Sequence, residues 1–457
     1  MGVCSALFEL GGMTIMHDAS GCNSTYTTHD EPRWYDMDSM VYISALTEME
    51  AIMGDDEKLL GDIEDAVREL HPKFVAIAGT PIPTMTGFDF EAVAAVAEQR
   101  TGVPCFGFAT TGMNTYIHGV SMAFETLAKR IVKDVEKEKK TESLTDNEGQ
   151  NVQVENCSEY TDSNQNGRDS TTAKKLKVNI LGLTPLDFSV NGQDSSIASW
   201  LESEGFEVVS RWAMGSTLEE IAMAGEADVN LVVSASGLAA AKVLFERFGM
   251  PYAVGLPIGS ELPGTFADLI KTKVSEFAEA DGAVDGAIAN ANAQRTDVSA
   301  ATFESREISI HSGIFLGESD TQNSATPNAA VSRKNKTDSV QPYNKGFAAV
   351  IGEGVASLSL ASAIELDCGI PAKVLCATEC PEDMLRECDR MTPDEDDIIP
   401  ELKGAAYVIA DPLYKPICPS EAKFIPLPSE GFSGRLYRDE IPNLITDFED
   451  FIEKRCI

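Results

Sequence analysis

Residues Phe74-Val75-Ala76-Ile77-Ala78 form a short apolar run, and Val103-Pro104-Cys105-Phe106-Gly107-Phe108 form a second one further along the chain. Between them, the apolar residues of Phe90–Ala97 recur at helical spacing, and Gly102 ends that pattern. Two strands joined by a helix run parallel, because parallel neighbours need a long crossover connection. This stretch therefore predicts an α/β fold built on a parallel sheet.

The same alternation of strands and helices returns in the middle and last thirds of the chain. A helix is predicted to begin at Ser216, with Glu219 three residues on as its capping partner, and another spans Leu238–Phe248. The predicted strands are 178–182, 206–209 and 230–233 in the middle third, and 347–351, 372–375 and 407–410 in the last third. Three Rossmann-like, doubly wound α/β domains with parallel sheets are therefore expected.

Two polar stretches divide the chain. Residues 133–175 carry charge runs and few apolar side chains, and residues 290–344 are rich in Ala, Asn, Ser and Thr. Both are expected to be linkers, and Ile308-Ser309-Ile310 within the second has the pattern of a short strand. The expected domains are accordingly 1–132, 176–289 and 345–457.

Composition limits the partners of this protein. The chain of 457 residues has a formal net charge of −37, which would repel nucleic acid and anionic membranes, so neither is expected to bind. An acidic, solubilised surface explains the charge, and a basic protein partner is a second explanation. The chain shows no signal peptide and no long apolar run, so a cytoplasmic location is expected. Its ten cysteines then favour free thiols or metal ligands over disulfides.

Two cysteines near the N-terminus are the first candidates for chemistry. Cys4 opens the segment Cys4-Ser5-Ala6-Leu7-Phe8-Glu9-Leu10-Gly11-Gly12, and Cys22 closes His17-Asp18-Ala19-Ser20-Gly21-Cys22. Thiolates held by glycine-rich backbone suit an iron–sulfur cluster, because glycine permits close approach to a bulky group. The spacing alone also fits two small buried thiols, which is the commoner role of a lone cysteine.

Further segments follow in an order that resembles the nitrogenase component 1 family, which includes the nitrogenase molybdenum-iron protein and dark-operative protochlorophyllide reductase. These segments are 47–54 leading into 57–60, 74–81 followed by 87–90, and Thr110-Thr111-Gly112 followed by Gly119. The resemblance covers nearly all of the chain and is strongest over residues 1–130. Pro81 stands where the family has a third cysteine.

The resemblance implies that Cys4 and Cys22 ligate a 4Fe-4S cluster. Two thiolates cannot complete a cubane, so the cluster would be shared between subunits. Either each protomer of a homodimer supplies two of the four sulfurs, or a related subunit of a heterodimer brings the missing ligands. Pro81 cannot ligate, which argues against the larger eight-iron cluster of nitrogenase itself.

A nitrogenase-type molybdenum cofactor is not expected. In the resembled subunit, a cysteine after an Asn-Leu-Val strand and one late histidine anchor that cofactor. Here Asn230-Leu231-Val232-Val233 runs on to Ser234, which is expected to be a helix-cap or turn residue. All histidines precede the third domain, at His17, His29, His71, His118 and His311. The chain also has no P-loop, so ATP would be hydrolysed only by a separate iron-protein partner.

Polar residues near the two cysteines are candidates for a supporting role. His17, Gly21 and Arg33 are expected beside the cluster, where a histidine or arginine can hydrogen-bond to sulfur and raise its potential. A polar loop that satisfies backbone groups is the alternative for His17, His29 and Arg33. His118 is a candidate for the wall of the central cleft that the resemblance implies.

Other motifs carry weaker signals. Cys376, Cys380 and Cys388 fit no common metal-site spacing, and packing at the end of an apolar strand explains Cys376 better. Cys105 likewise lies within an apolar strand. Gly352-Glu353-Gly354 follows a predicted strand like the start of a dinucleotide-binding loop, but the full motif is absent.

Taken with the resemblance, these residues predict an oxidoreductase. It would pass low-potential electrons from an ATP-hydrolysing iron protein, through the interfacial cluster, to a small-molecule substrate in the cleft between the domains. A tetrapyrrole is the leading substrate class. The alternative is a non-catalytic scaffold on which a metal cofactor is assembled, and a third possibility is a protein that keeps only the binding cleft.

Overall fold

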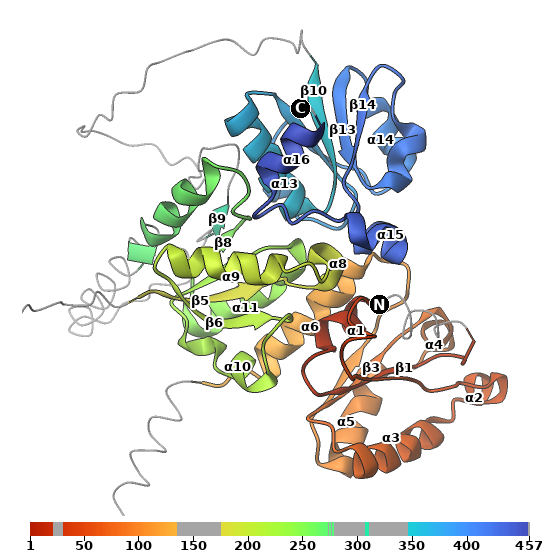
Figure 1. Ribbon diagram of the computed structural model, residues 1–457. Coiled ribbons are helices and arrows are strands. Elements are labelled where there is room, and N and C mark those ends of the chain that lie inside the picture. Colours follow the sequence, from red (N-terminus) through yellow and green to blue (C-terminus); the bar gives the residue numbers. More distant parts are fainter. Residues whose placement is uncertain are drawn as a thin grey trace, which may run out of the picture.

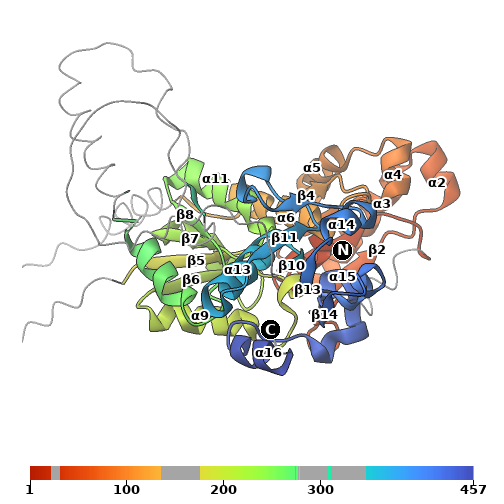
Figure 2. The same cartoon turned by 90° about the horizontal axis from the view of Figure 1, so that it is seen from above.

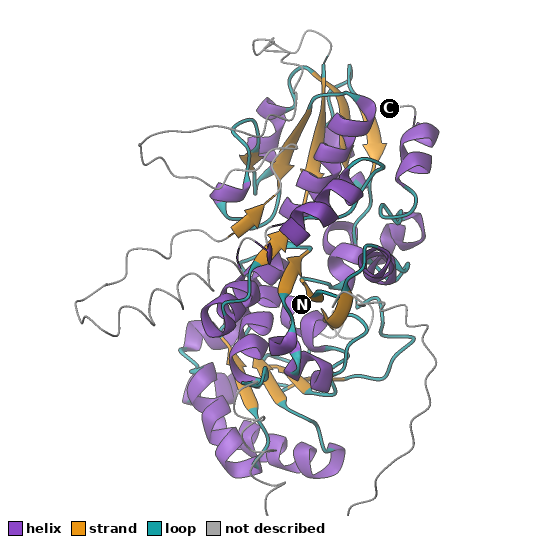
Figure 3. Cartoon of the chain, turned by 90° about the vertical axis from the view of Figure 1, so that its left-hand side faces the viewer, coloured by secondary structure: helices purple, strands orange, loops and turns teal. Residues whose placement is uncertain are grey.

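The computed structural model describes residues 1–21, 31–134, 175–272 with 274, 275 and 277, 307–309, and 346–455. It contains three sheets whose strands all run parallel, and helices cover both faces of the strands (Figure 1, Figure 3). The predicted α/β class with Rossmann-like parallel sheets is therefore confirmed. We call the parts of the chain around the three sheets the first, middle and third units.

The first unit is built on the sheet order β2-β1-β3-β4. Its strands are β1 Met13–Met16, β2 Met40–Ile43, β3 Val75–Ala78 and β4 Cys105–Phe108. Its helices are α1 Gly2–Leu7, α2 Glu48–Met53, α3 Asp56–Leu70, α4 Pro81–Thr86, α5 Phe90–Thr101 and α6 Tyr116–Arg130. The two apolar runs of the sequence are thus β3 and β4, and Gly102 ends α5 in the left-handed conformation that glycine adopts at little cost.

The middle unit has the sheet order β6-β5-β7-β8-β9. Its strands are β5 Lys177–Leu181, β6 Glu207–Trp212, β7 Val229–Val232, β8 Tyr252–Val254 and β9 Glu307–Ser309. Its helices are α8 Pro185–Phe188, α9 Gln193–Ser203, α10 Leu218–Ala222, α11 Leu238–Phe248 and the helical residues 262–272. β9 lies where a short strand was anticipated inside the polar stretch 290–344, and it extends the edge of this sheet.

One local prediction in the middle unit is wrong. The helix expected from Ser216 is α10, and its capping box pairs Thr217 with Glu220 rather than Ser216 with Glu219. Both pairs have the same spacing, and Ser216 is used otherwise, because its Oγ accepts a hydrogen bond from the backbone N–H of Arg211 at 2.9 Å. The helix therefore begins one residue later.

The third unit has the sheet order β12-β11-β10-β13-β14. Its strands are β10 Phe347–Gly352, β11 Ala372–Cys376, β12 Arg390–Met391, β13 Ala405–Ala410 and β14 Lys423–Pro426. Its helices are α13 Gly354–Ala363, α14 Glu395–Glu401, α15 Glu430–Ser433 and α16 Phe448–Arg455, and α13 continues into a π-helical turn at Ile364–Cys368. Short 3₁₀ turns occur at Ala224–Glu226, Ala235–Gly237, Glu382–Met384, Pro412–Ile417 and Gly434–Glu440.

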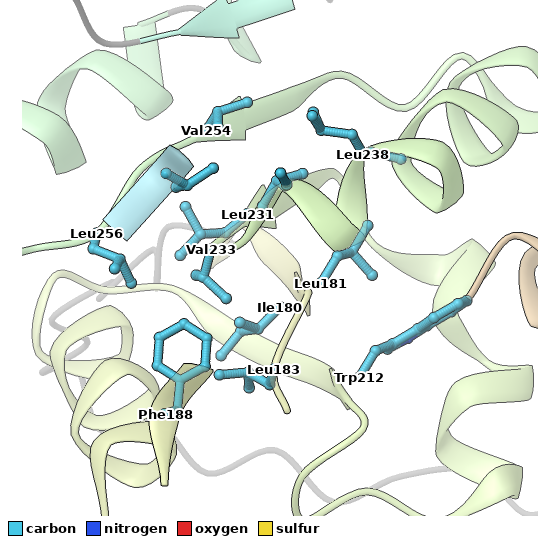
Figure 4. Close-up of a cluster of buried hydrophobic side chains, with 14 of the residues drawn as sticks. Ile180, Leu181, Leu183, Phe188, Trp212, Leu231, Val233, Leu238, Val254 and Leu256 are labelled. Atoms are coloured by element: carbon cyan, nitrogen blue, oxygen red, sulfur yellow. The ribbon is translucent and has the colours of Figure 1, made fainter. Parts of the chain in front are cut away.

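One apolar core joins the three units. The largest cluster of buried side chains takes members from α1 and α6, from β5 and β7, and from β10 and α13. Figure 4 shows its middle part, where Ile180, Leu231 and Phe188 pack together. At the boundary with the first unit, the ring of Trp212 meets Phe124 of α6 edge-on, with ring centroids 6.0 Å apart. The arrangement of the units is therefore fixed by burial as well as by the chain itself.

Helix α6 is central to this arrangement, because it packs on both α1 and α11. The N-terminus and α1 consequently lie in the middle of the molecule, close to α15 of the third unit (Figure 1, Figure 2). Within the described residues, no helix combines the length and the apolar character that a membrane span requires.

Candidate functional site

A cleft of about 540 Å³ opens where the first unit faces the third. Met16 and Ala78 end β1 and β3 at its floor, so the cleft lies at the carboxyl ends of parallel strands, where open α/β sheets bind ligands. The lining residues are Met1, Gly2, Val3, Cys4, Met16, Ala78, Gly79, Thr80, Pro81, Thr110, Thr111, Gly112, Asn114, Thr115, Tyr116, His118, Gly119, Thr378, Gly431 and Phe432. Its volume lies in the range of small-molecule sites.

Cys4 reaches this cleft because α1 lies tightly against α6. A side chain at Gly2 would place its Cβ only 2.1 Å from the carbonyl oxygen of Tyr116, and one at Gly119 would come within 3.2 Å of the Val3 nitrogen. Both positions need glycine for this approach. Burial raises the pKa of the Cys4 thiol above its usual value, so the free side chain is a neutral thiol.

The remaining wall of the cleft carries hydroxyl groups. Thr80 Oγ1 donates to the His17 carbonyl oxygen at 3.0 Å, and Thr110 Oγ1 donates to the Gly79 carbonyl oxygen at 2.7 Å. Glu379 of the third unit caps α6, since the backbone N–H of Thr115 donates to its Oε1 at 2.8 Å and the Thr115 hydroxyl donates to its Oε2. This contact fixes the two sides of the cleft relative to each other.

Of the two predicted cluster ligands, only Cys4 belongs to the described residues. Cys22 and His29 lie outside them. Gly21 is exposed just before that gap, and a Cβ there would meet no atom within 4 Å. The pairing of Cys4 with Cys22 therefore stays a prediction.

His17 is buried next to the cleft floor without lining the cleft. Its Nδ1 lies 2.9 Å from Ser44 Oγ, and its ring packs against Phe88 with centroids 4.3 Å apart. Burial lowers the pKa of His17 to about 4, although Asp18 and Glu50 raise it. The imidazole is neutral at physiological pH, and its backbone carbonyl holds Thr80 of the cleft wall.

Arg33 is buried beneath α1 with its guanidinium fully engaged. It donates to Glu9 at 2.8 Å and to Glu31 at 2.6 Å, and its centre lies 4.9 Å from the centroid of the Phe8 ring. It also donates to the carbonyl oxygen of Ser5 at 2.7 Å and to that of Ala213 at 3.1 Å. Arg33 thus holds α1, one residue from Cys4, against the middle unit.

His118 lines the cleft, as anticipated. Cys376 and Cys380 are buried together over α13, where a Cβ on Gly354 would come within 2.7 Å of the Cys380 sulfur and 3.5 Å of the Cys376 sulfur. Cys388 lies in the turn before β12. Among the residues that the structure describes, no group of three or more His, Cys, Asp or Glu side chains has the geometry of a metal site, and a packing role for these thiols stays a prediction.

The loop at Gly352-Glu353-Gly354 is no open phosphate site. The Glu353 carboxylate caps α13, accepting from the backbone N–H of Ala356 at 2.8 Å, and it also accepts from the N–H of Ala235 at 2.8 Å. A nucleotide phosphate would need this same helix terminus. Ser234 likewise acts as a cap, accepting from the Ser236 N–H at 3.3 Å.

A second group of residues, which no sequence motif marks, lies at the meeting point of the three units. The Tyr116 hydroxyl donates to Asp187 of α8, and Asp187 faces Glu353 across a smaller cavity of about 80 Å³. Burial and the charge of Glu353 raise the pKa of Asp187 to about 8. These residues are far apart in the chain. The only signal available was that Asp187 and Glu353 each follow the carboxyl end of a predicted strand.

The rim of the cleft carries exposed apolar side chains. They belong to α2, α4 and the turn that follows Gly112, and we call them the α2–α4 patch: Met49, Ile52, Met53, Met85 and Met113, each 69–86% exposed. Gly112 of the cleft lining directly precedes Met113 of this patch, and Pro81, which also lines the cleft, is the first residue of the helix that carries Met85. Apolar side chains gathered in this way mark interaction surfaces.

Comparisons with known proteins agree on one family. The family model described as "Nitrogenase component 1 type Oxidoreductase" matches residues 1–302. The chain is similar to the nitrogenase iron-molybdenum cofactor biosynthesis protein NifE of Clostridium pasteurianum. The two are 26% identical over 210 residues, and this aligned segment covers 45% of this chain and 37% of that protein. The chain is 22% identical over 215 residues to the nitrogenase molybdenum-iron protein alpha chain of the same organism, 46% of this chain and 33% of that protein. These matches span well under half of the relatives' length.

A solved structure supports the fold over a longer range. The structure titled "Nitrogenase Cp1 at pH 6.5" matches with a TM-score of 0.57 and 14% identity, covering 100% of this chain and 91% of that one. At this identity the match concerns the arrangement of the helices and strands alone.

Proposed function

Because the chain belongs to the nitrogenase component 1 type oxidoreductases, we propose that Cys4 and Cys22 hold one half of a 4Fe-4S cluster. The ligands of the other half would come from a neighbouring subunit. Members of this family bind iron–sulfur clusters in general. The observation that carries the proposal is the place of Cys4, whose side chain lines a cleft at the carboxyl ends of parallel strands.

The residues present fit half of such a cluster. Thiolates are the usual ligands of iron–sulfur clusters, and a buried thiol with a raised pKa loses its proton to solvent when a strong positive centre such as iron binds its sulfur. Cys4 is the thiol that reaches the cleft within the described residues, and Pro81, also in the wall, has no ligating atom. Cys22 and a second subunit are therefore needed to complete the set.

Such a cluster supplies one electron at a time, and this chain provides the surroundings. The Thr80, Thr111 and Thr115 hydroxyls, with His118, offer hydrogen bonds to a bound molecule, while Phe432 offers an apolar wall. We propose a reductase that takes its electrons from an ATP-hydrolysing iron protein. A flat unsaturated ring of the tetrapyrrole type is the substrate that we would test first.

The α2–α4 patch supports a partner subunit beside the cleft. Its five apolar side chains would be covered by a second copy of the chain or by a related subunit, and burying them would stabilise the assembly. The same partner would bring the missing ligands close to Cys4. Homodimer and heterodimer both satisfy this requirement.

A scaffold for cofactor assembly is the second candidate. It is favoured by the relatives named NifE, which are described as iron-molybdenum cofactor biosynthesis proteins. Their matches cover about the same share of this chain as the match of the molybdenum-iron protein alpha chain does. The anchors for that cofactor are not recognisable here. Ser234 is a buried cap, and the histidines in the described residues all lie in the first unit.

The test is iron and acid-labile sulfide content, with the EPR spectrum, of protein purified without oxygen. Cys4→Ser and Cys22→Ser should each remove the iron, whereas Cys388→Ser, which alters a half-buried thiol outside the lining of the cleft, should retain it. Protein without labile sulfide would refute the proposal. Oxidation of dithionite that depends on ATP, the iron protein and a tetrapyrrole would favour the reductase, and a cluster transferable to another protein would favour the scaffold.

A further inference from the structure

The bond between Tyr116 and Asp187 crosses the wall between two cavities. Tyr116 lines the cleft that holds Cys4, while Asp187 lines the smaller cavity between the middle and third units, and Phe432 borders both. The Tyr116 hydroxyl donates to Asp187 Oδ1. A hydrogen-bonded path therefore connects the inner cavity with the cleft.

Gly431 allows α15 to pack closely on the end of Tyr116. A Cβ at this position would lie 2.8 Å from the Tyr116 hydroxyl oxygen and 2.5 Å from its ring. Any larger residue would press on the hydroxyl and its bond to Asp187. Glycine is therefore required for the backbone of α15 to approach Tyr116.

Asp187 is held in an incomplete hydrogen-bonding environment. Its Oδ2 is buried and has no hydrogen-bond partner among the described residues. Asp411, on the wall of the same cavity, is different. Its Oδ1 accepts from the Leu413 N–H at 3.0 Å, and its Oδ2 accepts from the Ser429 N–H at 2.9 Å and the Ser433 hydroxyl at 2.8 Å. A carboxylate needs such donors when buried, and Asp187 lacks them at one oxygen.

The groups that face Asp187 act in opposite directions. Glu353 at the start of α13 favours the neutral form, as burial does, whereas the hydrogen bonds of the Tyr116 and Ser234 hydroxyls favour the carboxylate. Cys376 of β11 acts in turn on Tyr116. Burial and the charge of Glu353 raise the pKa of Asp187 to about 8, and burial raises the pKa of Glu353 as well. Two carboxyls that face each other in this way retain a proton at neutral pH.

We propose that Asp187 stores a proton and that Tyr116 delivers it to a substrate reduced in the cleft. This rests on the proposed reductase function, which supplies the electrons from the iron protein. The Tyr116 O–H bond breaks as its proton joins the atom made basic by the incoming electrons. The Asp187 O–H bond breaks as its proton moves to the Tyr116 oxygen, leaving a carboxylate. A proton from bulk solvent, carried by water in the inner cavity, then reprotonates Asp187, so the substrate gains one proton and the solvent loses one. Tyr116 is the catalytic group, and Asp187 acts through it.

The stored proton can be tested without cluster or substrate, by infrared titration of the full-length protein. We expect a carboxylic acid band at pH 7 that disappears with a midpoint near pH 8 and is missing in Asp187→Asn. Asp411→Asn is the matched control and should keep the band, because Asp411 is a buried carboxylate on the same cavity. No band in the wild type, or a band that survives in Asp187→Asn and is lost in Glu353→Gln, would overturn the proposal.

Delivery is tested with the complete system of iron protein, ATP and dithionite, using protochlorophyllide as the tetrapyrrole probe. Tyr116→Phe keeps the ring and should lower kcat about 100-fold or more with little change in KM, and Asp187→Asn should remove the loss of kcat near pH 8. Tyr414→Phe is the control, since Tyr414 packs on Phe432 outside both cavities and should keep wild-type kcat. An unchanged kcat in Tyr116→Phe would refute the delivery of a proton by Tyr116. A wild type without turnover would refute the reductase and delivery together, while the infrared result would still stand.

Discussion

The cleft around Cys4 and the inner cavity around Asp187 lie on either side of Tyr116, and they are built in opposite ways. The cleft is open, lined by hydroxyls, and bordered by exposed apolar residues that no described part of the chain covers. The inner cavity is small, lies between the middle and third units, and holds carboxyls within one chain. Under the proposed function, the first region would be completed by a second subunit, whereas the second is built from this chain alone.

The largest effect should come from the core beneath both regions. Trp212→Ala removes a fully buried ring that packs on Phe124 and donates from Nε1 to Ser210 Oγ at 2.8 Å. We expect a loss of about 3–5 kcal/mol in the free energy of unfolding. Denaturant titration should show one transition for the chain. Two separate transitions would contradict a core shared by the units.

A smaller change should damage the cleft alone. Gly2→Ala places a Cβ against the Tyr116 carbonyl and forces α1 away from α6, which we expect to cost about 1–3 kcal/mol. Iron content should fall because Cys4 moves with α1, while the infrared titration of Asp187 stays in place. Gly61→Ala in α3 is a control of the same size, because a Cβ on Gly61 meets no atom within 4 Å and its backbone is helical.

A pH series should isolate the inner cavity. The folded-state pKa of Asp187, about 8, lies above the unfolded value near 3.8, so its proton stabilises the folded state most at low pH. This contribution is lost as pH rises from about 4 to 8, with a slope of at most about 1.4 kcal/mol per pH unit. Asp187→Asn should remove this slope in denaturant titrations at several pH values. An unchanged slope would show that Asp187 does not titrate in this range.

The smallest effect on stability should accompany a clear effect on assembly. Met85→Lys changes an exposed residue of the α2–α4 patch and should alter the free energy of unfolding by no more than about 0.5 kcal/mol. Sedimentation should nevertheless show dissociation of the assembly. Leu436→Lys, which changes a highly exposed leucine outside the α2–α4 patch, is the matched control. Equal behaviour of the two variants would exclude the patch as the contact surface.

Much of the fold could be predicted because it depends on short-range patterns. The apolar runs 74–78 and 103–108 became β3 and β4, and the helix expected at Leu238–Phe248 has those same bounds. The capping residue of α10 was misplaced by one position, since Ser216 and Thr217 offer the same chemistry and only the contact with Arg211 distinguishes them. Patterns of this kind say which elements form but not which of two adjacent hydroxyls is free to cap.

The site was predictable only where a motif marks it. Cys4 stood out by its glycine-rich surroundings and does lie in the cleft. Arg33 was recognised as a candidate but not as the support of α1, because its partners Glu9, Ser5 and Ala213 come from separate segments. Asp187 went unnoticed and Glu353 was noted only within a weak dinucleotide-loop pattern, since a raised pKa depends on burial among distant residues. No spacing along the chain encodes that environment.

The shared apolar core bears on how molecules come and go. Its buried side chains form one continuous cluster from α1 through β5 to α13. The three units therefore cannot move apart as rigid bodies without exposing this core to water. A ligand that enters the cleft would then rely on local side-chain rearrangement, for example of His118 in its lining, rather than on movement of whole units. Where the proposed second subunit covers the cleft, its rate of dissociation would limit how fast ligands exchange.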